Sequence, residues 1–274
     1  MAGSDCAAMQ EREAAGESAR GARARQIEAL YLTSDVVRQR AVTLARLAPQ
    51  PGERMLDVGC GPGLLAEDIA GAVGSAGAVR GIDHSEAMIA LARARCARFD
   101  WAIFERADAA SLPCADGLFD GAVCTQVLEY VPDIGRALDE LRRVLRPGGR
   151  LLLVDTDWES CVWASGDDAR MRRMLAAWDH HCPHPRLPRT LGPKLAHHGF
   201  RVDTVEAIAI VNAMFDADTY SQGMMPVIAE FAVRRSSVEE IDARAWLDDL
   251  HALRVRGEAF FSLDRHLFLA TRTS

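Results

Sequence analysis

The sequence predicts an α/β fold with a doubly wound, mostly parallel sheet. Strand-like apolar runs alternate with helical patterns through residues 49–157, which is typical of a parallel sheet covered by helices on both faces. The first run, 54–58, ends in three glycines at alternate positions, and a helical pattern follows. A strand, a tight glycine turn and a helix in that order let a ligand approach the backbone at the carboxyl end of the sheet.

Two helices are predicted ahead of the sheet. Apolar residues recur at helical spacing on both sides of a break at Thr33-Ser34-Asp35, which offers a helix cap. Residues 1–22 are rich in Ala, Gly, Glu and Arg and contain no apolar stretch. We therefore expect a disordered tail over 1–22 and a helical lid over 23–48.

A cofactor-binding core is predicted over 49–157. Its strands are expected near 54–58, 78–82, 101–106, 119–124 and 150–155, and its helices near 63–73, 85–97 and 133–145. The last of these strands is an uninterrupted apolar run, which suits a strand buried on both faces.

The rest of the chain is predicted to complete the sheet and to add a helical cap. The segments expected are a cap insertion at 158–188, a core helix and strand at 189–212, cap helices at 213–257 and a final core strand at 258–274. Within the cap helices, Ser237 is the expected N-cap of the second helix.

Composition narrows the class of protein. A formal net charge of -7 argues against nonspecific binding to nucleic acid, which requires positive potential along the phosphates. No apolar run approaches the roughly 20 residues that span a bilayer. The seven cysteines occur singly, so neither a zinc site nor a disulfide framework is indicated. We expect a cytoplasmic protein without a metal and without a nucleic-acid or membrane partner; the oligomeric state stays open.

The glycine turn favours S-adenosylmethionine over a dinucleotide. The spacing Gly59-x-Gly61-x-Gly63 differs from the G-x-G-x-x-G of a pyrophosphate cradle. Asp57 precedes the glycines, and a carboxylate there would repel a pyrophosphate but attract the ammonium of a methionine moiety. Asp83 ends the next strand, where a carboxylate could reach a ribose. A tight turn that binds nothing is the alternative interpretation.

The sequence resembles the class I S-adenosylmethionine-dependent methyltransferases in their ubiquinone-biosynthesis-like branch. The four resembling motifs are Leu56–Gly63, Gly81–Met88, Arg106–Ala109, and Phe119–Val123 with Leu141–Gly149. The resemblance covers about residues 50–157. It implies a Rossmann-like methyltransferase fold of seven strands, with the seventh antiparallel beside the fifth, and S-adenosylmethionine as the cofactor.

The expected cofactor contacts lie in these motifs, apart from Gln126, which follows the fourth strand. Asp57 would orient the methionyl ammonium, Asp83 would accept from the ribose hydroxyls, and Asp108 would accept from the adenine amine. The other expected contacts are the turn residues Gly59, Cys60, Gly61 and Gly63, the adenine neighbours His84, Met88 and Ala109, and Gln126 near the sulfonium. Asp83 could instead cap the following helix, and Asp108 could be an ordinary loop carboxylate.

Candidate catalytic residues lie outside the core. Methyl transfer from a sulfonium needs little acid–base assistance, because positioning alone can supply much of the rate. His180 and His181 lie in a histidine-rich segment of the cap, and either could deprotonate an acceptor at neutral pH. A solvated loop or a helix C-terminal cation is the other interpretation of these histidines. Tyr31 could close over the cofactor, or could simply be buried between helices.

The cap also predicts the kind of acceptor. Its aromatic and methionine side chains suggest an apolar, adaptable pocket, formed by Trp158, Trp163, Trp178, Tyr220, Met224 and Met225. We therefore expect methylation of a small apolar or aromatic metabolite, in secondary metabolism, on oxygen, nitrogen or carbon. A cofactor-binding sensor or scaffold is the alternative. An arsenite methyltransferase is disfavoured because Cys161 and Cys182 are the only cysteines of the cap.

Overall fold

The computed structural model describes residues 21–235 and 238–274. Its strands are β1 (Arg54–Val58), β2 (Ala78–Asp83), β3 (Ala102–Arg106), β4 (Phe119–Thr125), β5 (Leu145–Trp163), β6 (Phe200–Asn212) and β7 (Phe261–Arg272). Its helices include α2 (Ser34–Leu47), α3 (Leu64–Val73), α4 (Glu86–Arg95), α5 (Ile134–Val144), α6 (Asp168–Trp178), α7 (Pro188–His197), α8 (Tyr220–Arg235) and α9 (Glu240–Arg256). Two short 3-10 helices, η1 (Leu128–Tyr130) and η2 (Asp179–His181), lie after β4 and after α6. Residues 21–31 are helical ahead of α2.

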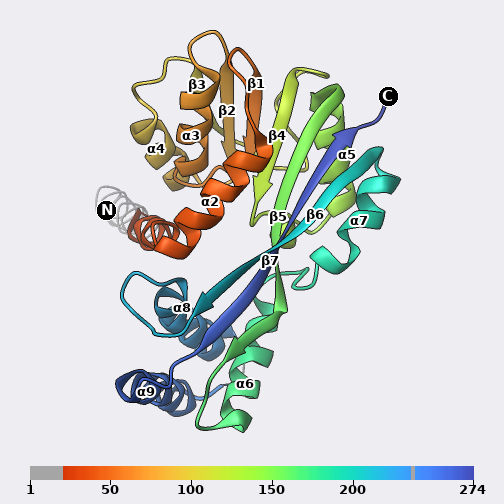
Figure 1. Cartoon of the computed structure of the whole chain (residues 1–274). Coiled ribbons are helices and arrows are strands. Elements are labelled where there is room, and N and C mark those ends of the chain that lie inside the picture. The colour runs from red at the N-terminus through yellow and green to blue at the C-terminus, as the bar shows by residue number, and fades with distance from the viewer. Residues whose placement is uncertain (1–20, 236–237) are drawn as a thin grey trace, which may run out of the picture.

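These strands form one seven-stranded sheet in the order β3-β2-β1-β4-β5-β7-β6 (Figure 1). Strands β1 to β5 pair in parallel, whereas β7 pairs antiparallel with both β5 and β6. The predicted fold class is therefore confirmed, including the insertion of the seventh strand beside the fifth. The carboxyl ends of β1, β2 and β4 meet at one edge of the sheet, where the order reverses between β1 and β4.

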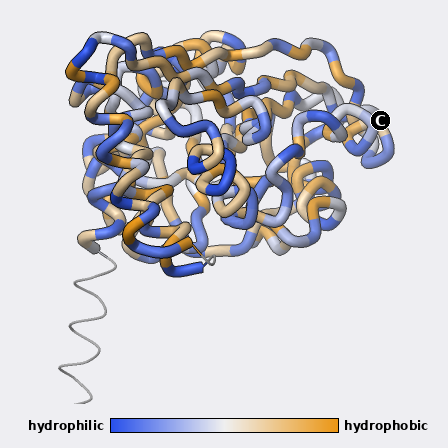
Figure 2. The backbone as a smooth tube through the Cα atoms, turned by 90° about the horizontal axis from the view of Figure 1, so that it is seen from below, coloured by the Kyte–Doolittle hydropathy of each residue, from blue (hydrophilic) through white to orange (hydrophobic). Residues whose placement is uncertain are grey.

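Helices cover both faces of the core sheet. One apolar cluster joins inward residues of α3 and α4 to strand residues such as Met55 and Val123. The other joins α5 and α7 to the alternate strand residues, such as Leu56 and Ala122. The helices are amphipathic; in α5 the buried residues are Ile134, Ala137, Leu138, Leu141 and Val144. Figure 2 shows the resulting alternation of hydrophobic and hydrophilic residues along the chain.

The cap is built on the sheet itself. Strands β5, β6 and β7 continue past the core and carry α6, α8 and α9 at their far end (Figure 1). The prediction that the fifth strand ends near 155 and that a cap insertion begins at 158 is therefore wrong. After a register shift, β7 pairs with β5 as far as Trp163, opposite Phe261. A third apolar cluster, centred on the buried Trp246, fills the space between these helices and the strand ends.

Other segment boundaries also differ from expectation. Residues 1–20 of the expected tail lie outside the described residues, and the helix that follows already includes residues 21 and 22. The expected cap Ser237 lies outside them as well, and α9 begins later, with Glu239 at its N-cap. Helix α7 begins at Pro188, since proline suits the first turn of a helix. Within the described residues, no helix is long and apolar enough to cross a membrane.

Candidate functional site

A cavity of about 990 Å³ lies between the carboxyl edge of the sheet, the N-terminal helices and the cap. Twelve of the fourteen residues expected at the site line it: Asp57, Gly59, Cys60, Gly61, Asp83, His84, Met88, Asp108, Ala109, Gln126, Tyr31 and His181. The structure thus brings together side chains from β1, β2, β4, the first helix and η2. One side of the cavity is formed by the core motifs and the other by cap aromatics.

The three turn glycines have different surroundings. All three have positive φ, which favours glycine. A Cβ on Gly59 would lie 2.0 Å from Cγ2 of Val127, and one on Gly63 would lie 2.9 Å from the Cα of Ala92 in α4. A Cβ on Gly61 would meet only the Tyr31 ring, at 3.7 Å. Gly59 and Gly63 therefore permit close packing within the protein, and Gly61 is the glycine that opens toward the cavity.

Asp57 is a buried carboxylate without a full set of partners. Its side chain is 1% exposed, and its Oδ2 has no hydrogen-bond partner among residues 21–235 and 238–274. Burial first, and then the nearby negative charge of Asp83, raise the pKa of Asp57 to about 7. A cation placed here would pair with this carboxylate and stabilise its ionised form.

Asp83 holds the glycine turn in place. Its Oδ2 accepts from the Gly61 amide at 2.9 Å, and its Oδ1 accepts from the Ser85 amide at 2.9 Å. The helix α4 is capped by Ser85, whose hydroxyl accepts from the Met88 amide, so Asp83 is not its cap. The His84 ring approaches Asp83 at 3.4 Å, and its side chain is 92% exposed at the cavity mouth.

The expected adenine neighbours lie together along the next part of the wall. Met88 is buried against the cavity, and Ala109 follows Asp108 in the loop after β3. Asp108 is exposed, and its Oδ1 already accepts from the Ala110 amide at 2.9 Å. Cys60 is buried beside Gly61, and burial raises the pKa of its thiol, which therefore stays neutral.

Gln126 has a strained backbone at the end of β4. Its φ is 57°, an uncommon value for a residue with a side chain. The strain is held by two bonds to β5: the Gln126 amide donates to the Val154 carbonyl at 2.7 Å, and the Thr156 hydroxyl donates to Oε1 at 2.6 Å. The side chain is thereby fixed at the boundary between the two halves of the cavity.

The cap half of the cavity is lined by stacked aromatic rings. His181 stacks on Trp178 with ring centroids 4.0 Å apart, and it meets Trp158 edge to face at 4.6 Å. Its Nδ1 lies 2.6 Å from the Trp178 carbonyl, while Nε2 is buried and has no partner within the described parts of the chain. Burial lowers the pKa of His181 to about 4, so the ring is neutral at physiological pH.

Tyr31 faces both halves of the cavity. Its ring packs against the turn at Gly61, and its hydroxyl interacts electrostatically with Asp83, Tyr220 and Arg265. Burial first, and then Tyr220 and Asp83, raise the pKa of Tyr31 to about 12, while the positive charge of Arg265 acts in the opposite direction. The phenol is therefore a neutral hydrogen-bonding group above the glycine turn.

The structure does not bring every expected residue to the site. His180 is exposed on η2 and does not line the cavity, since it precedes His181 in a tight turn that directs the two rings differently. Gly63 packs under α4 instead. Trp163 and Met225 belong to the interior of the cap, and neither Cys161 nor Cys182 reaches the cavity wall.

Two features of the wall were not expected from the sequence. Glu129 and Asp155 are fully buried behind it, and burial raises the pKa of both carboxyl groups. Arg265 of β7 lines the cavity and is 2% exposed. A signal for Arg265 was available, because Phe261, Leu263, Arg265 and Leu267 are the inward positions of an alternating strand.

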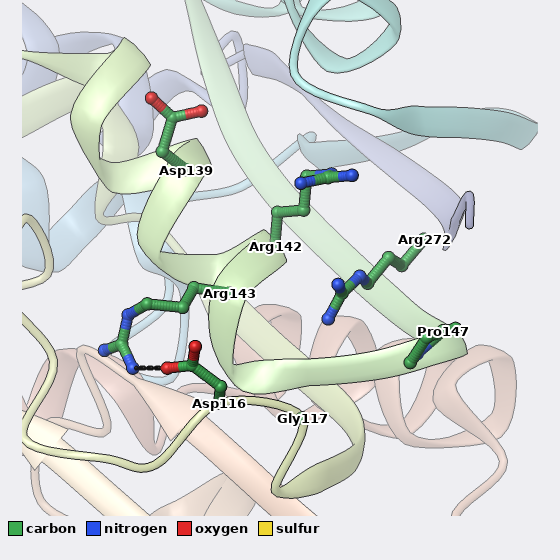
Figure 3. A pocket seen from close by; sticks show the side chains of 7 residues that line it. All are labelled: Asp116, Gly117, Asp139, Arg142, Arg143, Pro147 and Arg272. Carbon is green, nitrogen blue, oxygen red and sulfur yellow. Dashed lines mark hydrogen bonds and ion pairs between the residues drawn. The ribbon is translucent and has the colours of Figure 1, made fainter.

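A second, smaller hollow of about 500 Å³ lies at the opposite edge of the sheet (Figure 3). It is lined by Asp116, Gly117, Asp139, Arg142, Arg143, Pro147 and Arg272. Arg143 is paired there with Asp116 at 2.7 Å and with Glu140 at 2.8 Å. These contacts tie α5 to the loop before β4, so we assign Arg143 a structural role.

Comparisons with known proteins agree with this geometry. Residues 56–153 match the family described as methyltransferase domain. The chain is 34% identical over 245 residues to a 37.1 kDa protein in a transposon of Streptomyces fradiae, covering 88% of this chain and 69% of that one. It is 42% identical over 111 residues to the 2-phytyl-1,4-naphtoquinone methyltransferase of Synechococcus elongatus, covering 39% of this chain and 48% of the enzyme, about half its length.

Among solved structures, the [4+2]-cyclase SpnF is 25% identical, with a TM-score of 0.55 over 87% of this chain and 81% of that one.

Proposed function

This chain belongs to the class I S-adenosylmethionine-dependent methyltransferases, in their ubiquinone-biosynthesis-like branch, and we propose that it methylates a small acceptor held in the aromatic half of the cavity. The observation that carries this proposal is the orphaned, buried Oδ2 of Asp57 at the end of β1. A buried carboxylate without a partner is costly, and the cationic donor of this family would remove that cost.

The residues around Asp57 fit the donor. Asp57 would hold the methionyl ammonium, and the open side of Gly61 would admit the adenosyl part against the backbone. Asp83 retains lone pairs for the ribose hydroxyls while it fixes the turn through the Gly61 and Ser85 amides. Met88 and Ala109 would flank the adenine. When bound, S-adenosylmethionine supplies a methyl group already activated by its sulfonium.

The protein contributes position and the exclusion of water. Tyr31 would lie across the glycine turn, and Gln126, fixed by Thr156 and Val154, would separate the donor from the acceptor. Holding donor and acceptor in line can contribute roughly 7–11 kcal/mol to the lowering of a bimolecular barrier.

His181 is the residue that we propose accepts the acceptor's proton. Because Nδ1 donates to the Trp178 carbonyl, Nε2 carries a lone pair, and this atom is buried without a partner in the described chain. The indole N–H of Trp178 is unpartnered in the same part of the structure and could donate to an oxygen of the acceptor. An acceptor with a hydroxyl or amine group on an apolar ring would satisfy both atoms.

The aromatic wall supports an apolar or aromatic acceptor. Trp158, Trp178 and Phe231 line this half of the cavity, and flat rings pack favourably against such side chains. The naphtoquinone methyltransferase among the relatives is named for an aromatic acceptor, which agrees with this choice.

A labelled-methyl assay tests the proposal. The protein is incubated with S-adenosylmethionine carrying a deuterated methyl group and a panel of phenols, naphthols and aromatic amines, and mass spectrometry follows S-adenosylhomocysteine and the labelled product. We expect both to form in equal amounts. Binding of the donor without any labelled product across the panel would favour a sensor, a scaffold, or a reaction without methyl transfer such as that named for the cyclase relative.

We also propose that the enzyme works in the cytoplasm on free small molecules. Cys60, Cys96, Cys114, Cys124, Cys161 and Cys182 are buried free thiols, which suits a reducing compartment. Fractionation of producing cells checks this location.

A further inference from the structure

Arg265 is a buried cation in the wall of the cavity. In the described parts of the chain, no carboxylate lies within salt-bridge distance of its guanidinium. Its Nη1 donates to Oε1 of Gln39 in α2, and its Cζ lies 4.6 Å from the centre of the Tyr220 ring. Its Nε is buried and has no partner in this same part of the molecule.

Two buried acidic groups, Glu129 and Asp155, interact with Arg265 without an ion-pair contact among the described residues. Glu129 and Asp155 influence it only at longer range, and burial raises the pKa of both, which disfavours their charged forms. Glu129 is instead bonded to the Thr156 amide at 3.0 Å. Charges buried in proteins are normally paired, because an unpaired one loses its hydration without compensation. The open space beside Arg265 is the place where a partner can enter.

We propose that Arg265 binds a carboxylate of the methyl acceptor, so that the substrate is an aromatic or apolar acid. This inference rests on the proposed function and names its substrate class. A guanidinium offers a planar fork of N–H donors that matches a carboxylate better than any other common group. The adjoining wall, formed by Tyr220 and Met224 of α8, is apolar and suits the body of such an acid.

The donor also carries a carboxylate, on its methionyl group. Another arginine of the cavity, Arg40 of α2, is better placed for that group. Arg40 donates to Asp68 of α3, and α3 is the helix that follows the glycine turn. Arg265 also donates to Gln39 of α2, but its guanidinium lies over the ring of Tyr220 in the cap helix α8. We therefore assign the acceptor's carboxylate to Arg265, and the experiment separates the two sources.

The probes are two matched pairs titrated by calorimetry. The first pair is 1-naphthoate and its neutral analogue 1-naphthalenemethanol, with and without saturating S-adenosylhomocysteine. The second pair is S-adenosylhomocysteine and 5′-methylthioadenosine, which lacks the amino-acid carboxylate. The proteins are the wild type, Arg265→Met, Arg265→Lys and the control Arg254→Met, which removes an exposed arginine of α9 that does not line the cavity. Thermal unfolding checks that each variant is folded.

We expect the wild type and the control to bind naphthoate at least about tenfold more tightly than naphthalenemethanol, as a charged hydrogen bond predicts. Arg265→Met should abolish that preference and leave S-adenosylhomocysteine binding unchanged, while Arg265→Lys should retain part of it. A loss of S-adenosylhomocysteine affinity with unchanged methylthioadenosine affinity would overturn the assignment to the acceptor and give the arginine to the donor.

The wild-type comparison needs no variant. Suppose that the wild type binds S-adenosylhomocysteine but does not bind naphthoate more tightly than naphthalenemethanol. The proposal then fails, and Arg265 is a structural counter-ion for Glu129 and Asp155. If the wild type binds no S-adenosylhomocysteine, the proposed function fails instead, and the naphthoate titration without cofactor still decides the role of Arg265.

Discussion

The Nδ1 atom of His181 lies 2.6 Å from the carbonyl oxygen of Trp178, and the two rings stack with their centroids 4.0 Å apart. This pair fixes the histidine tautomer, because a carbonyl can only accept, so Nδ1 must carry the proton. The lone pair of Nε2 is then available within the cavity wall. One backbone bond thus decides what the side chain can do for an acceptor.

Replacement of His181 tests that relationship. We expect His181→Ala to lower kcat about 100-fold, the lower end for a general base, because a group with a pKa of about 4 is a weak proton acceptor. Since the ring is neutral above pH 4, wild-type turnover should show no inflection from His181 between pH 5 and 8. Steady-state kinetics measure the kcat of the variant and the pH profile of the wild type.

The neighbouring histidine supplies the control for this variant. His180 is exposed and does not line the cavity, so His180→Ala should keep wild-type turnover. Equal losses in the two variants, or full activity of His181→Ala, would remove His181 from the mechanism.

Asp57 predicts a proton release on cofactor binding. Its pKa of about 7 in the free protein must fall when an ammonium pairs with the carboxylate, so binding expels a proton below pH 7. S-adenosylhomocysteine affinity should therefore rise with pH from 5 to 7, by at most about tenfold per unit, and then level off. Calorimetry in buffers of different ionisation enthalpy counts the protons.

Asp57→Asn should abolish this pH dependence and weaken binding at pH 7.5 by about 1.5–3 kcal/mol. Asp116→Asn, in the hollow at the opposite edge of the sheet, should behave as the wild type. A pH-independent affinity in the wild type would exclude Asp57 as the ammonium partner.

Asp83 is expected to contribute to cofactor affinity in two ways. Asp83→Ala removes the ribose acceptor and releases the amide of Gly61, so calorimetric affinity should fall by at least about 1.5–3 kcal/mol. Glu86→Ala, on the exposed face of α4 nearby, is the matched control. An unchanged affinity in Asp83→Ala would refute the ribose role.

The glycines should separate stability from binding. Gly59 and Gly61 both have positive φ, a backbone conformation that costs a residue with a side chain roughly 1–2 kcal/mol of stability. Gly59→Ala adds a clash with Val127, so it should be about 1–3 kcal/mol less stable than Gly61→Ala. Gly61→Ala should remain folded but lose cofactor affinity. Chemical denaturation and calorimetry compare the two, and the reverse ranking would contradict this division of roles.

The core of the site was predictable because its signals are local. Asp57, the glycines and Asp83 lie at strand ends whose pattern and spacing fix their place on the sheet edge. The sequence could not decide between His180 and His181, since a single 3-10 turn after α6 directs only the second toward the wall.

The remaining features depend on contacts between distant segments. The left-handed backbone of Gln126 is held by β5, and the Glu129 amide donates to the Asp155 carboxylate of the same strand. Strand β5 continues to Trp163 only because β7 pairs with it there. The alternation of β7 places Arg265 at an inward position, but its role in the cavity wall depends on contacts with Gln39 and Tyr220 from distant segments.

The assignment of the cavity to S-adenosylmethionine is tested by a calorimetric titration of the wild-type protein at pH 7.5 with S-adenosylmethionine and, separately, with NAD⁺. We expect binding of S-adenosylmethionine at one site per chain, in competition with S-adenosylhomocysteine, and no binding of NAD⁺ there. Binding of NAD⁺ in place of S-adenosylmethionine would contradict it.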